Sequence, residues 1–136
     1  MPTTKEDLKH LTLLGKDIRT TEKIEVFPNH APGFMEITLQ CQEFTSRCPV
    51  TGQPDYATIE IRYVPVQWIA ESKSVKLFLE RYRETGIFHE HLAVELGKEF
   101  VRFVEPAQLE VEVDFNVRGG ISVSATYCYN AVETKK

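Results

Sequence analysis

The chain has 136 residues, the length of one domain. Its 42% hydrophobic and 26% charged residues are ordinary for a protein that folds around its own core. A formal net charge of −4 argues against a protein that binds nucleic acid through its overall charge. The first residues lack the pattern of a signal peptide, and no apolar run reaches the ~20 residues of a membrane span. We therefore expect a cytoplasmic protein with a single domain over residues 1–136, in which residues 1–20 and 130–136 are peripheral.

Strict alternation of apolar and polar residues predicts four strands, each with one face in the core and one in water. The first pair covers residues 35–42 and 57–63, and the second pair covers residues 109–117 and 121–127. A shorter alternating run over residues 23–27 is a candidate for a further strand. Alternation of this kind is typical of an antiparallel sheet.

Between the two strand pairs, apolar residues recur at helical spacing over residues 73–84 and 88–104. Gly86 separates these two segments, and Pro106 follows the second. The pair Gly119–Gly120 predicts a tight hairpin between the last two strands. The order ββααββ predicts an α+β fold, with two helices on one face of a four-stranded antiparallel sheet. The two sheet edges favour a cyclic oligomer, and the alternative is a monomer whose N-terminal segment covers an edge.

The segment between the first two strands, residues 43–56, is long for a hairpin loop and contains Cys48. Arg47 precedes this cysteine, and Asp55 follows it by seven positions. A neighbouring cation lowers the pKa of a thiol, and a nearby carboxyl group supplies a proton donor. Cys48 is therefore a candidate nucleophile. The alternative is a loop cysteine without a chemical role.

The other candidate metal ligands form no recognisable zinc motif. The three cysteines are an odd number without CxxC spacing, and we expect Cys41 and Cys128 to be small buried residues of their strands. His89 and His91 are two positions apart, so on a helix they point in different directions and cannot share one ion. Two interpretations of Glu90 remain open. Its negative charge interacts favourably with the helix dipole at the start of the helix or, if the side chain is buried, its carboxylate accepts hydrogen bonds from two N–H groups of a guanine-like ring.

The segment Glu71–Phe78 places two cations at the start of a predicted helix. We expect Ser72 to cap this helix. Lys73 and Lys76 then lie in the first turn, where the helix dipole disfavours positive charge. Free backbone N–H groups and two ammonium groups form a receptor suited to phosphate. The alternative is an exposed helix face with two lysines that bind no ligand.

Taken together, these segments resemble one enzyme family. The chain is similar to the NADPH-dependent 7-cyano-7-deazaguanine reductases of queuosine biosynthesis, which are nitrile reductases of the tunnelling fold, in their short single-module form. The resemblance extends over residues 22–128. The segments that carry it are Phe44–Asp55, Glu71–Phe78, Phe88–Glu90 and Arg118–Ser122.

The resemblance implies a reaction and a set of site residues. In this family a cysteine, matched by Cys48, adds to the substrate nitrile as a thioimide, and an aspartate, matched by Asp55, supplies a proton. Two NADPH molecules per product then reduce 7-cyano-7-deazaguanine to 7-aminomethyl-7-deazaguanine, and no metal is required. The resemblance assigns substrate binding to Ala70, Glu71, Ser72, His89 and Glu90, and cofactor binding to Lys73, Lys76 and Arg118.

The resemblance also implies a homo-oligomer built from rings, with pockets between subunits and with neither nucleic acid nor a membrane as a direct partner. One alternative is a GTP cyclohydrolase or pterin-type enzyme of the same fold, which would require a metal. A second alternative is a purine-binding scaffold without catalysis. Cys48 and Asp55 argue against the scaffold, because binding alone requires neither residue.

Overall fold

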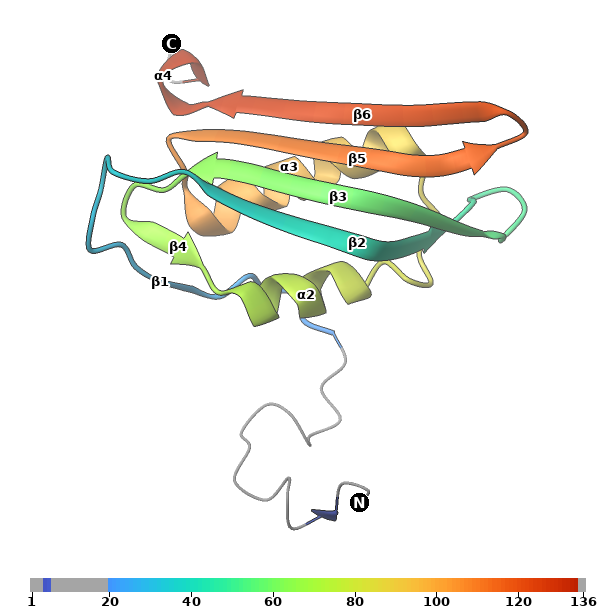
Figure 1. The fold of residues 1–136 in the computed structure, drawn as a ribbon, viewed down its shortest axis with the longest axis horizontal. Coiled ribbons are helices and arrows are strands. Elements are labelled where there is room, and N and C mark those ends of the chain that lie inside the picture. Colours follow the sequence, from blue (N-terminus) through green and yellow to red (C-terminus); the bar gives the residue numbers. More distant parts are fainter. Residues whose placement is uncertain (1–3, 6–19, 135–136) are drawn as a thin grey trace.

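The computed structural model describes residues 4–5 and 20–134, and its largest element is an antiparallel sheet with the strand order β2-β3-β5-β6 (Figure 1). Strands β1 and β4 pair with each other as a second, two-stranded antiparallel sheet. The strands are β1 (Val26–Pro28), β2 (Ile37–Arg47), β3 (Pro54–Val64), β4 (Trp68–Ala70), β5 (Gln108–Arg118) and β6 (Ile121–Asn130).

Two helices, α2 (Ser72–Glu80) and α3 (His89–Val104), lie on the same face of the main sheet (Figure 1). Helix α3 packs across β5 and β6, whereas α2 lies beside β2. A Cβ atom at Gly97 of α3 would lie 2.0 Å from the ring of Tyr127 in β6, so only glycine permits this close approach. The short helix α4 (Ala131–Thr134) follows β6.

The predicted α+β class, with antiparallel strands and helices on one sheet face, is confirmed. The element order is richer than ββααββ, because β1, β4 and α4 lie outside the main sheet and its two longer helices. Two glycines with positive φ, Gly119 (59°) and Gly120 (77°), form the predicted two-residue turn between β5 and β6. The first of the two longer helices ends at Glu80, four residues before the predicted end.

The first hairpin of the main sheet corrects the prediction of a long loop over residues 43–56. Strand β2 continues to Arg47 and β3 begins at Pro54, so the turn contains only residues 48–53. The pairing register shifts between Cys41 and Phe44, which is a bulge. The extra residue reverses which alternate positions of β2 face the core. The alternation of apolar and polar residues is therefore interrupted at the bulge, although the strand continues beyond it.

Most of the N-terminal segment that was predicted to be peripheral lies outside the described residues. At the other end, Asn130 completes β6 and residues 131–134 form α4. Within residues 4–5 and 20–134, no helix is long and apolar enough to cross a membrane.

Candidate active site

Three chain segments meet at one end of the main sheet: the turn between β2 and β3, the start of α3 and the end of β5 (Figure 1). Each contributes a side chain that the sequence singled out. Cys48 lies in the turn, and Asp55 is the second residue of β3. His89 is the first residue of α3, and Arg118 is the last residue of β5.

Asp55 lies at the centre of this cluster and is only 3% exposed. The Arg118 guanidinium donates to Oδ1 of Asp55, and it also donates to Oε1 of Gln53 at 2.9 Å. His89 Nε2 lies 3.2 Å from Oδ2 of Asp55. The His89 ring stacks on Phe115 with a centroid distance of 3.4 Å and an interplanar angle of 7°. Each oxygen of the buried carboxyl group therefore lies beside a side-chain nitrogen from another element.

The turn that carries Cys48 is held by its own backbone. The Cys48 N–H donates to the Gln53 carbonyl at 2.8 Å, and the Cys48 carbonyl accepts from the Gly52 N–H at 3.0 Å. A hydrogen bond from the Thr51 side chain, supported by backbone N–H groups of the turn, lowers the pKa of the Cys48 thiol below its ordinary value. A lower pKa increases the fraction of thiolate at neutral pH, and the thiolate is the nucleophilic form.

Replacing Thr51 by valine should make Cys48 less reactive near neutral pH. Loss of the side-chain hydrogen bond raises the pKa of Cys48, so its reactivity rises only at higher pH. We expect iodoacetamide to alkylate the Cys48 peptide several-fold more slowly at pH 7, and at the unaltered rate where the thiol is fully ionised. Thr51→Ser retains the hydroxyl and should react like the unaltered protein. Equal rates at pH 7 for all three proteins would contradict this role of Thr51.

The second group of predicted site residues, residues 70–76, lies at the start of α2, toward the other end of the sheet (Figure 1). Glu71 caps this helix: its carboxylate accepts from the N–H groups of Lys73 at 2.8 Å and Ser74 at 2.7 Å. The prediction of Ser72 as the cap is therefore wrong, and Ser72 is exposed. Because Glu71 occupies these N–H groups, the helix start is not an open phosphate receptor, and the carboxylate offsets the nearby lysine charges.

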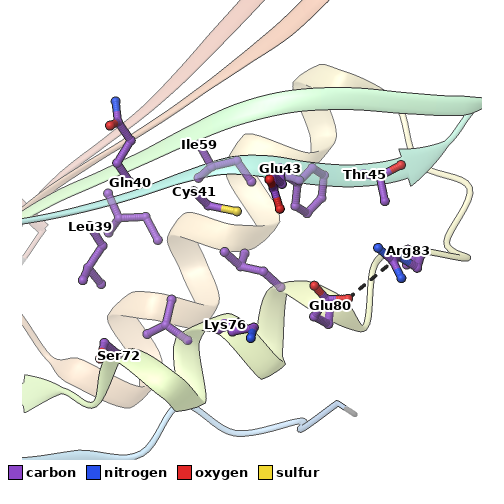
Figure 2. A pocket seen from close by; sticks show the side chains of 14 residues that line it. Leu39, Gln40, Cys41, Glu43, Thr45, Ile59, Ser72, Lys76, Glu80 and Arg83 are labelled. Atoms are coloured by element: carbon purple, nitrogen blue, oxygen red, sulfur yellow. Dashed lines mark ion pairs between the residues drawn. The ribbon is translucent and has the colours of Figure 1, made fainter. Parts of the chain in front are cut away.

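A cavity of about 300 Å³ lies between β2 and α2 (Figure 2). Ser72 and Lys76 line it from the helix, and Cys41 lines it from the strand. Most of its other lining side chains are apolar. Neither Cys48 nor Asp55 lines this cavity, so within one chain the two groups of predicted residues form separate regions.

The remaining candidates from the sequence have mixed outcomes. Cys41 is half-buried, but Cys128 is exposed, so the prediction that both are buried is wrong for Cys128. Cys128 lies on the edge strand β6, in which residues that pack on the core alternate with exposed residues, and it occupies one of the exposed positions. Glu90 is exposed in the single chain. The described residues contain no group of three His, Cys, Asp or Glu side chains that could hold a metal ion.

A family model described as QueF-like protein matches residues 54–134. A relative from Syntrophus aciditrophicus, named NADPH-dependent 7-cyano-7-deazaguanine reductase, is 47% identical over 88% of this chain and 86% of its own length. Relatives with the same name come from Frankia casuarinae (48% identity over 88% of this chain and 95% of its own) and Streptococcus thermophilus (44% over 96% and 84%). The chain belongs to the QueF-like family.

The fold of this QueF-like chain also occurs in a crystal structure of the apo form of the archaeosine synthase QueF-Like. The two superpose with a TM-score of 0.66 at 24% sequence identity, over 71% of this chain and 94% of the other. This similarity concerns the fold alone.

In this QueF-like chain, sequence reasoning missed Phe115 as a member of the cluster and did not predict the contact between Arg118 and Asp55. Phe115, on which His89 stacks, is one of several apolar residues at alternating positions of β5, and nothing in the sequence distinguishes it from the others. Arg118 was assigned to the cofactor, but the structure brings it to Asp55, 63 positions away. Contacts over such separations have no local sequence signal.

Proposed function

We propose that this chain reduces the nitrile of 7-cyano-7-deazaguanine to the primary amine of 7-aminomethyl-7-deazaguanine in queuosine biosynthesis, with two NADPH consumed per product. Membership of the family supports this proposal, because curated relatives of similar length carry the name of this reductase. The observation that carries it is a cysteine of lowered pKa at the same end of the sheet as a buried aspartate. A protein that only binds a purine requires neither.

In the proposed reaction Cys48 is the nucleophile and Asp55 is the proton donor. The thiolate attacks the nitrile carbon and a C–S bond forms; one π bond of the nitrile breaks, and the nitrogen takes the proton of Asp55. NADPH, when bound, supplies a hydride to the substrate carbon in each of two reductions, and in the second reduction the nitrogen also takes one proton from water. Between these reductions the C–S bond breaks, and its electron pair returns to Cys48 as the thiolate. His89 and Arg118 hold the Asp55 carboxyl group in place.

We propose that Glu90 binds the N–H edge of the base. Its carboxylate is exposed at the start of α3, next to His89, so it is accessible to a ligand near the Cys48 turn. Hydrogen bonds from N–H donors to a carboxylate are charge-assisted and strong. We further propose that the base contacts Ala70, Glu71 and Ser72 at the start of α2.

For the cofactor phosphates we propose Lys73, Lys76 and Arg118. Within residues 20–134, Lys73 and Lys76 form no ion pair, so their ammonium groups are available to an anion. Arg118 donates to Asp55 and Gln53, but its side chain is 45% exposed. A guanidinium has five N–H donors, so Arg118 can contact a phosphate while it holds Asp55.

Replacing Lys73 and Lys76 together by glutamine should raise the KM for NADPH by roughly tenfold or more, because charge-assisted contacts to phosphate are lost. The affinity for the nitrile base should change much less. High salt should reduce the difference in KM between the variant and the unaltered protein, because salt weakens the attraction between the lysines and the cofactor phosphates in the unaltered protein. Lys98→Gln, which removes an exposed lysine from α3, is the control and should leave KM unchanged. An equal loss of affinity for NADPH and for the nitrile base would contradict the assignment of these lysines to the cofactor phosphates.

We also propose that each chain is one tunnelling-fold domain in a ring-shaped homo-oligomer, with sites between subunits. Two observations support the ring. The Cys48 turn and the start of α2 lie apart within one chain, and β2 and β6 are the edge strands of the main sheet. A neighbouring subunit would bring its lysines to Cys48 and pair with an open edge. The cytoplasm is the location we propose, since a thiolate nucleophile requires a reducing compartment.

The decisive experiment monitors NADPH oxidation after 7-cyano-7-deazaguanine is added to the purified protein. We expect two NADPH to be oxidised for each amine formed. Ring formation is measured on the same sample by light scattering. Hydrolysis of GTP that stops on chelation, without NADPH oxidation, would instead indicate the cyclohydrolase alternative. Binding of the base without turnover would indicate the scaffold.

A further inference from the structure

Among the described residues, the hydroxyl of Ser46 is the only buried side-chain polar atom without a hydrogen-bond partner. Ser46 is 0% exposed and lies in β2, two residues before Cys48. The other buried serine, Ser74, donates to the Glu71 carbonyl at 2.7 Å and accepts from the Glu25 N–H at 2.9 Å. A buried hydroxyl without a partner is unfavourable, so the burial of Ser46 needs a reason that the burial of Ser74 does not.

Ser46 lies directly opposite Asp55 in the ladder between β2 and β3. Both residues are buried on the same face of the sheet. The Cβ atoms of opposite residues are roughly 4.5–5.5 Å apart, a gap that a serine hydroxyl and an aspartate carboxyl group can bridge. Asp55 accepts a hydrogen bond from Arg118 at Oδ1, and His89 Nε2 lies 3.2 Å from Oδ2, so each carboxylate oxygen has room for a further donor.

We propose that Ser46 is a positioning residue for Asp55, to which its hydroxyl donates a hydrogen bond during the reaction. The inference rests on the proposed function, in which Asp55 gives its proton to the nitrile nitrogen. When that proton leaves, the Ser46 hydroxyl donates to the carboxylate that forms. Ser46 therefore stabilises the ionised form of Asp55 after the proton has left.

The test compares Ser46→Ala with the unaltered protein in two independent measurements. The first is the ¹³C signal of the Asp55 carboxyl carbon in the covalent adduct that the protein forms with 7-cyano-7-deazaguanine without NADPH, the state in which Asp55 has given up its proton. The chain has four aspartates, and Asp55→Asn identifies the signal. We expect Ser46→Ala to move this signal, because the carboxyl group loses a hydrogen-bond donor. The second is the rate at which the protein forms a covalent adduct with 7-cyano-7-deazaguanine without NADPH, followed by intact mass. We expect this rate to fall about tenfold or more, with unchanged affinity for the base.

Two controls separate positioning from a structural role. Ser46→Ala removes an unpartnered hydroxyl and should not lower the melting temperature, whereas Ser74→Ala breaks two hydrogen bonds and should lower it. In a protein that already carries Asp55→Asn, adding Ser46→Ala should not lower the rate of adduct formation any further, because Ser46 acts through Asp55.

An unmoved Asp55 signal would overturn the inference, even if the chain reduces the nitrile as proposed. The inference would also be overturned if Ser46→Ala lowered the rate of adduct formation by the same factor with and without Asp55→Asn. If the unaltered protein forms no adduct, the proposed function fails, and the inference that rests on it fails with it.

Discussion

Cys48→Ala should form no covalent adduct with 7-cyano-7-deazaguanine and should oxidise no NADPH when the nitrile is added. The unaltered protein, mixed with the nitrile without NADPH, should gain the mass of one substrate molecule, since the thioimide cannot proceed without hydride. Peptide mapping should place this mass within residues 48–53, the turn in which hydrogen bonds lower the pKa of the Cys48 thiol. Intact-mass spectrometry under mild conditions is the measurement.

The matched controls are Cys41→Ala and Cys128→Ala, both of which should retain the adduct. Cys128 is the more informative control, because its thiol is exposed and accessible to reagents. Exposure alone does not make a nucleophile, and Cys128 lies outside the cluster around Asp55. An adduct mapped to Cys128, or full turnover by Cys48→Ala, would refute the mechanism.

Asp55→Asn should slow adduct formation by about a hundredfold or more while the base still binds. General acid catalysis contributes roughly 10²–10⁴ to a rate, and asparagine has no acidic proton to give. The amide has nearly the size of the carboxyl group, so the buried position stays filled. The time course of the mass increase measures the rate, and equilibrium titration measures binding of the base.

Asp114→Asn is the control for this substitution, because Asp114 lies exposed in the neighbouring strand β5. It should form the adduct at the unaltered rate. If Asp55→Asn also reacts at that rate, the nitrile nitrogen obtains its proton elsewhere. Asp55 would then serve only to hold Arg118 and His89.

Sequence patterns report local structure, and this explains which parts of the fold could be predicted. Alternation over residues 109–117 and 121–127 gives both ends of β5 to within one residue and the start of β6, because most of each strand has one face on the core. Strand β6 continues three residues beyond the predicted end. The same reasoning fails in β2, where the bulge after Cys41 exchanges the faces. Residue preference also fails at the start of α2, where serine is a favoured cap and the sequence predicts Ser72, but the backbone geometry selects Glu71.

The sequence by itself determined the α+β class, the tight turn at Gly119–Gly120, the placement of Cys48 outside a strand and the resemblance to a family that the comparisons confirm. These features depend on local periodicity and on motifs, which are continuous in the chain. Only the tertiary structure decided the surroundings of Asp55. The pairing of β2, β3 and β5 and the packing of α3 bring it together with Ser46, His89 and Arg118. Such contacts join residues far apart in sequence, so they exist only once the sheet has formed.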